Sequence, residues 1–124
     1  MIDELEINGD LGEFHSIEQE VRFYDNVVVI GPDLNIEADE LLYELADERA
    51  ILQGRPRVQY GELDATADKV EYLMAEEMLY MRGNVEGSRG QQQFSSDEVE
   101  VDLAGNKIKL SGQARMELPE GELE

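Results

Sequence analysis

The chain has 124 residues, enough for one domain with a modest core. Its 30 acidic and 10 basic residues give a formal net charge of −20, which disfavours nucleic acids and anionic membrane surfaces as partners because both attract clustered Lys and Arg. The absence of cysteine excludes disulfides, thiolate metal sites and a cysteine nucleophile, and no apolar run approaches the ~20 residues of a membrane-spanning helix.

The first residues, 1–4 (Met-Ile-Asp-Glu), carry neither the basic region nor the apolar stretch of a signal peptide. The chain also opens inside the first of the repeats described next. We therefore interpret it as a trimmed form of a longer precursor, and these residues do not reveal a compartment.

One six-residue pattern recurs at a constant step of 29 residues. Residues 38–43 (Ala-Asp-Glu-Leu-Leu-Tyr) return as 67–72 (Ala-Asp-Lys-Val-Glu-Tyr) and 96–101 (Ser-Asp-Glu-Val-Glu-Val), with a degenerate copy at 9–14 (Gly-Asp-Leu-Gly-Glu-Phe). A second pattern keeps the same step at 25–27 (Asp-Asn-Val), 54–56 (Gly-Arg-Pro), 83–85 (Gly-Asn-Val) and 112–114 (Gly-Gln-Ala). A fixed period of this length predicts four stacked units, none of which buries its apolar face alone.

The second unit shows the expected local structure. Leu34, Ile36 and Ala38 alternate with polar residues, which predicts a strand with one buried face. After Ala38 the apolar positions shift by one residue, to Leu41, which predicts a β-bulge and a bend in this strand. A polar connector leads to a second strand, in which Gly54 marks another bend.

Two bent strands in each of four units predict an all-β fold, a bent and stacked antiparallel β-jellyroll whose two facing sheets enclose an apolar interior. The connectors are too short for parallel crossovers, and the period of two with many Val, Ile and Tyr residues argues against helices. We expect one domain over residues 1–118 and an acidic tail over 119–124, where Pro119 and three glutamates limit further strand pairing.

Equivalent positions of the units carry apolar side chains, which predicts rows of them in the interior. The four sets are Val21, Ala50, Leu79 and Ile108; Phe23, Leu52, Met81 and Leu110; Ile7, Ile36, Ala65 and Phe94; and Phe14, Tyr43, Tyr72 and Val101.

Strands that read Ala-Asp-x-x-x-Tyr and Gly-Asn-Val resemble the OstA-like (LptA-like) family of periplasmic lipopolysaccharide-transport proteins. The matching segments are residues 38–43, 67–72, 83–85 and, less closely, 25–27, within a resemblance that runs from about Leu5 to Leu118. The resemblance implies a non-catalytic, cofactor-free bridge that shields lipopolysaccharide acyl chains in an apolar groove in the periplasm. It also implies head-to-tail association, with itself and with other β-jellyroll components, by pairing of edge strands near residues 5–14 and 108–118.

The predicted groove lining consists of apolar residues on both strands of the units. These residues are Val27, Ile36, Ala38, Leu41, Tyr43, Leu52, Val58, Ala65, Ala67, Val70, Tyr72, Leu79, Met81, Val85, Phe94, Val99, Val101, Ile108, Leu110 and Met116. Flexible methionines among and near them suit a surface that accommodates variable acyl chains. The alternative is a closed core in a structural or polymerising module without a lipid ligand, and the acidic residues are expected on the outer face.

An aspartate recurs in every unit, at positions Asp10, Asp39, Asp68 and Asp97. We interpret these carboxylates as acceptors for backbone N–H groups freed at the bulges. The alternative is a ladder of metal ligands, but the sequence lacks a clustered calcium-binding loop, and we expect no metal site.

Catalytic arrangements are scarce. His15 is the sole histidine and lies in a predicted connector, so a Ser-His-Asp triad elsewhere is excluded. The glycine-rich residues 83–90 lack the Gly-Lys-Ser/Thr ending of a phosphate-binding loop and are predicted to form a hairpin turn. No pair of carboxylates stands out for glycoside chemistry, so a carbohydrate-active β-solenoid is a distant alternative and we predict no enzyme.

Overall fold

The computed structural model describes residues 5–117, in which the regular structure is strand and turn without a helix. The strands are β1 (Glu6–Asn8), β2 (Leu11–His15), β3 (Glu20–Gly31), β4 (Leu34–Glu44), β5 (Arg49–Gln53), β6 (Arg57–Tyr60), β7 (Leu63–Thr66), β8 (Lys69–Leu73), β9 (Met78–Arg89), β10 (Gln92–Asp102), β11 (Lys107–Ser111) and β12 (Arg115–Glu117). They form one twelve-stranded sheet with antiparallel pairings between neighbours. The all-β, bent antiparallel jellyroll is confirmed, whereas the boundary at 118 and the tail 119–124 lie outside the described residues.

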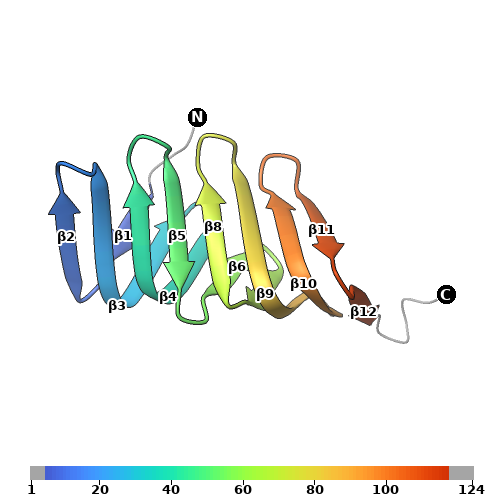
Figure 1. Ribbon diagram of the computed structural model, residues 1–124. Helices are drawn as coiled ribbons and strands as arrows, with labels where there is room; N and C mark the ends of the chain where they lie inside the picture. The colour runs from blue at the N-terminus through green and yellow to red at the C-terminus, as the bar shows by residue number, and fades with distance from the viewer. Residues whose placement is uncertain (1–4, 118–124) are drawn as a thin grey trace.

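The sheet is folded over on itself, so that it has two arms (Figure 1). The first arm, in front in Figure 1, has the strand order β2-β3-β4-β5-β8-β9-β10-β11. The second arm, behind it, has the order β1-β3-β4-β6-β7-β9-β10-β12. The long strands β3, β4, β9 and β10 run through both arms and therefore hold them together along the bends.

The bend between β3 and β4 comes from a bulge, although the extra residue is on a different strand from the one predicted. Asp25 and Asn26 of β3 stand opposite the single residue Asp39 of β4. Ala38 and Leu41 are both buried, so the shift of apolar positions after Ala38 is real, while the extra residue lies on the partner strand β3. The same two-against-one arrangement recurs in β9 opposite β10.

The residue pairs at the four bends have left-handed backbone conformations. The pairs are Asp25 and Asn26 (φ 63° and 53°), Gly54 and Arg55 (86° and 50°), Gly83 and Asn84 (86° and 48°), and Gly112 and Gln113 (80° and 50°). At Gly83 an added Cβ would lie 2.6 Å from the Asp68 Oδ2 atom, so the neighbouring strand leaves no space for a side chain there. Glycine thus allows the aspartate strand to approach the bend closely.

The recurring aspartates join neighbouring strands at these bends. The Asp68 backbone N–H donates to the Gly83 carbonyl at 2.9 Å, and the Asp68 carboxylate accepts a hydrogen bond from Asn84 Nδ2 at 2.9 Å. Asp10 repeats both contacts with Asp25 and Asn26, at 2.9 and 2.8 Å. The carboxylates are acceptors as predicted, but the donor shown at these two sites is an asparagine side chain instead of a backbone N–H.

Two further expectations about turns are corrected. Residues 83–89 are not a hairpin turn, because β9 continues through them to Arg89, and of the predicted segment Gly90 alone belongs to the turn. His15 is the last residue of β2 and not part of the connector, and its Nε2 atom lies 3.2 Å from Glu13 Oε1. In both cases cross-strand pairing with a neighbour outweighs the local turn signal.

Candidate functional site

The interior between the arms is lined by rows of apolar side chains, because residues directly opposite in paired strands face the same side. One row of the first arm contains Val21, Tyr43, Ala50, Tyr72, Leu79, Val101 and Ile108, and the next contains Phe23, Leu41, Leu52, Val70, Met81, Val99 and Leu110. A row of the second arm contains Ile7, Val29, Ile36, Val58, Ala65, Phe94 and Met116. The period-two alternation therefore identified the inward face of these strands.

Most of the predicted lining residues are buried between the arms. The exceptions are Tyr43, Ile108 and Leu110, which are partly buried and pack against the core, and Met116, which is 47% exposed. Met116 belongs to β12, which pairs with β10 and has no further described strand on its other side. A correct inward register does not bury a side chain at the end of the sheet.

Several buried residues were absent from the predicted lining although they follow the same alternation. They are Val29, Leu34, Ala50, Leu63 and Met74. The signal that identified their neighbours applies to all but Met74, which follows β8 in a connector. Its burial depends on contacts of the connector that alternation along a strand does not report.

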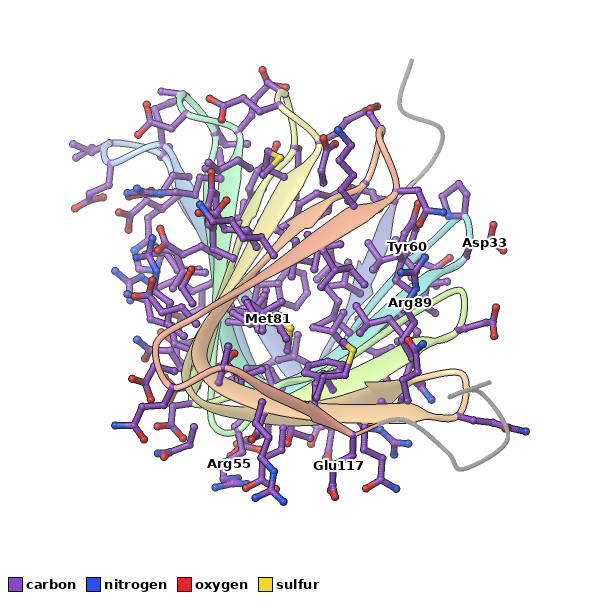
Figure 2. The ribbon with its side chains drawn as sticks, turned by 90° about the vertical axis from the view of Figure 1, so that its right-hand side faces the viewer. Asp33, Arg55, Tyr60, Met81, Arg89 and Glu117 are labelled. Carbon is purple, nitrogen blue, oxygen red and sulfur yellow. The ribbon has the colours of Figure 1, made fainter. Side chains whose placement is uncertain are left out.

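The interior between the arms is a packed apolar core. Ile36, Leu52, Val70 and Leu79 have no exposed surface, and Ser96 is the one polar residue among the buried residues described. Figure 2, viewed along the stack of strands, shows side chains filling the space between the arms, with Met81 near its centre.

We call the mouth the hollow of about 460 Å³ between the tips of the two arms, on the side away from the bends. It is lined by Tyr60, Leu63 and Arg89 of the second arm and by Leu103, Asn106 and Ile108 of the first. The Tyr60 hydroxyl donates a hydrogen bond to the Leu103 carbonyl at 3.1 Å. This contact joins the two arms directly across the mouth, and sequence reasoning did not single out either residue.

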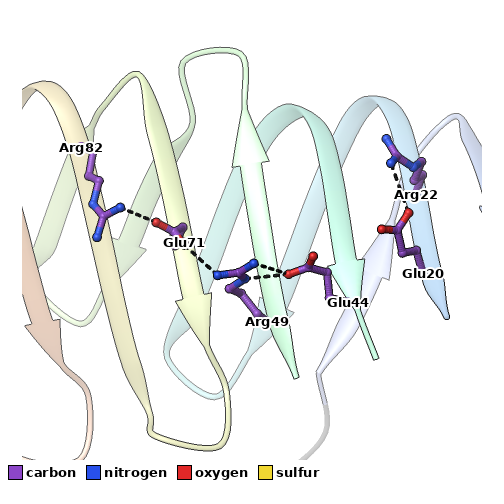
Figure 3. Close-up of polar contacts among 6 residues, drawn as sticks. All are labelled: Glu20, Arg22, Glu44, Arg49, Glu71 and Arg82. Carbon is purple, nitrogen blue, oxygen red and sulfur yellow. Dashed lines mark hydrogen bonds and ion pairs between the residues drawn. The ribbon is translucent and has the colours of Figure 1, made fainter. Parts of the chain in front are cut away.

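The ion-paired side chains lie on the outer face of the sheet. Across the first arm, Arg49 contacts Glu44 at 2.6 Å and Glu71 at 3.7 Å, and Glu71 also contacts Arg82 at 2.6 Å (Figure 3). The chain of ion pairs crosses β4, β5, β8 and β9 and connects neighbouring strands. The core thus stays free of charge although the protein has a formal net charge of −20.

Two pKa shifts report on the two sides of the sheet. On the outer face, hydrogen bonds from Arg57 at 2.9 and 2.7 Å hold the pKa of Asp64 below its ordinary 3.8. On the inner face, burial raises the pKa of Tyr72 above its ordinary 10.0, and the charges of Glu77 and Tyr60 add to the effect. The interior therefore favours uncharged groups.

Residues 5–117 contain no group of three or more His, Cys, Asp or Glu side chains placed to hold a metal ion. The same residues include no helix with the length and apolar character needed to cross a membrane.

A folded sheet with an apolar interior and a charged exterior defines the class of all-β proteins in which a jellyroll surrounds a hydrophobic space. The family model of the LptA/(LptD N-terminal domain) LPS transport proteins matches residues 6–122, so the chain belongs to this lipopolysaccharide-transport family. The fold is similar to that of LptH, the LptA homologous periplasmic component of the conserved lipopolysaccharide transport device of Pseudomonas aeruginosa. That similarity has a TM-score of 0.84 at 9% sequence identity and covers 94% of this chain and 95% of LptH. A comparison with curated protein sequences gave no match.

Proposed function

We propose that this protein is a non-catalytic periplasmic bridge that shields the acyl chains of lipopolysaccharide between its two arms. The observation that carries the proposal is the uninterrupted set of apolar rows, which extends across the sheet from β3 to β11 in a member of this transport family. An acyl chain that lies across these rows is removed from water along its whole length. The charged outer face keeps the loaded protein soluble.

The closed interior sets the energetic condition for this function. Each buried acyl methylene contributes ~0.8 kcal/mol, so ten of them contribute ~8 kcal/mol. Separation of the arms breaks contacts of residues such as Leu79 and Met81, which are fully buried. Acyl chains between the arms replace those contacts with equivalent apolar ones, so the cost of opening is largely offset once the ligand is in place.

The ends of the sheet support association in a row. Strands β1 and β2 end the arms on one side, and β11 and β12 end them on the other. Leu11 and Phe14 on β2 are 52% and 62% exposed, and Met116 on β12 is 47% exposed. Edge strands with exposed apolar side chains favour strand addition, so we propose that copies of this chain and other jellyroll components of the transport system pair through these edges. Light scattering tests this, because a mass that stays monomeric up to millimolar concentration contradicts it.

Photocrosslinking tests the lipid path. A photoreactive phenylalanine analogue replaces Tyr72 in one variant and Tyr80 in a matched control, and each variant is incubated with lipopolysaccharide. Tyr72 pairs with Leu79 on the inner face, whereas Tyr80 pairs with Glu71 on the outer face of the same two strands. We expect adducts at position 72 and not at position 80. Equal labelling at both positions contradicts an interior path.

The closed interior also favours a second candidate, a structural or polymerising module that uses its apolar residues only as a core. Ile36 and Val70 are completely buried among protein side chains, as in an ordinary core. Absence of adducts at both photoreactive positions, in variants that keep the circular dichroism of the wild type, supports this second candidate and contradicts the first.

A further inference from the structure

Arg89 occupies an unusual position for a basic residue of this protein. It stands opposite Leu63 of β7, two residues beyond Gly87, which stands opposite the buried Ala65. Residues paired directly across strands face the same side, so Arg89 lies on the inner face at the tip of the second arm. All ten basic residues fall within the described part of the chain, and Arg89 is the one that a strand register directs inward.

Within residues 5–117 the guanidinium group of Arg89 also has no ion-pair partner. No described carboxylate lies within ion-pair distance of it, whereas Arg22, Arg49, Arg57 and Arg82 each contact an acidic side chain. Figure 2 shows Arg89 beside Tyr60 on the open side of the molecule. A guanidinium with free donors at the rim of an apolar space is suited to an anionic group attached to an apolar chain.

We propose that the mouth binds the anionic, phosphate-bearing headgroup of an amphiphile whose apolar chains lie between the arms, and that Arg89 contacts the anion. This inference rests on the function proposed above and adds the residue that recognises the headgroup. The Tyr60 hydroxyl donates a 3.1 Å hydrogen bond to the Leu103 carbonyl. An entering headgroup displaces this hydroxyl from the carbonyl, and the freed hydroxyl becomes a second donor beside Arg89.

The acidic residues of the mouth define which anions bind. Asp33 and Glu62 line the same hollow from turns of the second arm, so the mouth does not bind anions unselectively. In a protein with a net charge of −20, a small free anion is repelled and gains little from one arginine. An amphiphile gains its affinity from the interior, and Arg89 then discriminates between headgroups.

The test uses two amphiphiles with the same chain, dodecyl phosphate and the uncharged dodecyl maltoside, below their micelle concentrations in isothermal titration calorimetry. Arg89→Gln is compared with Arg55→Gln, which makes the same change of charge at an exposed bend (Figure 2). Because a charge-assisted hydrogen bond is lost, we expect Arg89→Gln to weaken dodecyl phosphate about tenfold and to leave dodecyl maltoside unchanged. Arg55→Gln leaves both affinities unchanged, and Arg89→Lys retains part of the phosphate preference.

Each other outcome overturns the inference in a distinguishable way. Equal losses in Arg89→Gln and Arg55→Gln mean that only net charge matters, and equal losses for both amphiphiles mean that Arg89 acts through structure. Displacement of dodecyl phosphate by millimolar inorganic phosphate means that the free anion is the ligand. If the wild type binds neither amphiphile, the proposed function fails together with its headgroup site, whereas the three preceding outcomes leave that function standing.

Discussion

Gly83 at the bend of β9 is the position where a single methyl group most directly tests how the arms are joined. Its φ of 86° is in the left-handed region, and an added Cβ would meet Asp68 Oδ2 at 2.6 Å and Asp68 Cβ at 2.9 Å. Gly61, in the turn between β6 and β7, has a similar backbone (φ 57°) but nothing within 4 Å of an added Cβ. Gly61→Ala is therefore a matched control for Gly83→Ala.

The two substitutions share one cost and differ in another. A non-glycine residue in the left-handed region costs about 1–2 kcal/mol at either site. Gly83→Ala additionally forces the Asp68 strand away, and overpacking of this kind costs about 1–3 kcal/mol. Before the common gain from a less flexible unfolded chain is counted, Gly61→Ala lowers the free energy of unfolding by about 1–2 kcal/mol and Gly83→Ala by about 2–5 kcal/mol. The gain from a less flexible unfolded chain is the same for both and cancels in the difference.

Urea denaturation followed by far-ultraviolet circular dichroism measures both changes by linear extrapolation. Equal destabilisation by Gly83→Ala and Gly61→Ala refutes the reasoning, because close approach of Asp68 then has no energetic consequence. Combining Gly83→Ala with Asp68→Ala gives a second check. The double change removes Oδ2 but keeps the Asp68 Cβ, so we expect partial recovery relative to the sum of the single losses.

Three further predictions concern the two faces of the sheet and the mouth. The native pKa of Tyr72 is raised, so the stability that its neutral hydroxyl contributes is complete below pH 10.0 and is lost as the pH rises through the native pKa. In urea titrations we expect Tyr72→Phe to make the fall of unfolding free energy at alkaline pH shallower, and an unchanged slope contradicts the assigned burial effect. Glu71→Gln breaks the 2.6 Å ion pair with Arg82, and because the Glu71 side chain is only 13% exposed we expect a loss of about 1 kcal/mol of unfolding free energy. A double-mutant cycle with Arg82→Gln measures the coupling between the two side chains, and additive losses contradict the ion pair. Tyr60→Phe removes the hydrogen bond across the mouth, and we expect it to speed the uptake of a fluorescent fatty acid measured by stopped flow. The control Tyr24→Phe, on the outer face, leaves the uptake rate unchanged. Equal rates for the two variants contradict a closing role for Tyr60.

Local alternation was sufficient to predict strands and their buried faces. Each inward residue, such as Val70 or Leu79, belongs to a period of two that burial of one face imposes on any strand. The bends were also visible, because a bulge shifts the apolar positions by one residue, as it does after Ala38. These features depend on neighbours along the chain, so an amino-acid sequence records them directly.

The partner of each strand decided the rest. Whether the extra residue at a bend lies on β3 or β4 depends on which strand stands opposite, and the answer, Asp25 and Asn26 on β3, requires the register. Pairing likewise turned the glycine-rich residues 83–89 into a strand, although their local composition is typical of a turn.

The distance between the arms determined what the interior and the mouth are. The strand registers place Met81 and Arg89 on the inner face, but a register does not say how closely the opposite arm approaches. The fold brings Tyr60 within hydrogen-bonding distance of Leu103, which lies 43 residues later in the sequence, and it closes the core completely around Met81. Alternation along a strand is a local property, whereas packing between layers is the sum of contacts among residues far apart in the chain, so the closed interior and the mouth emerge only in the tertiary structure.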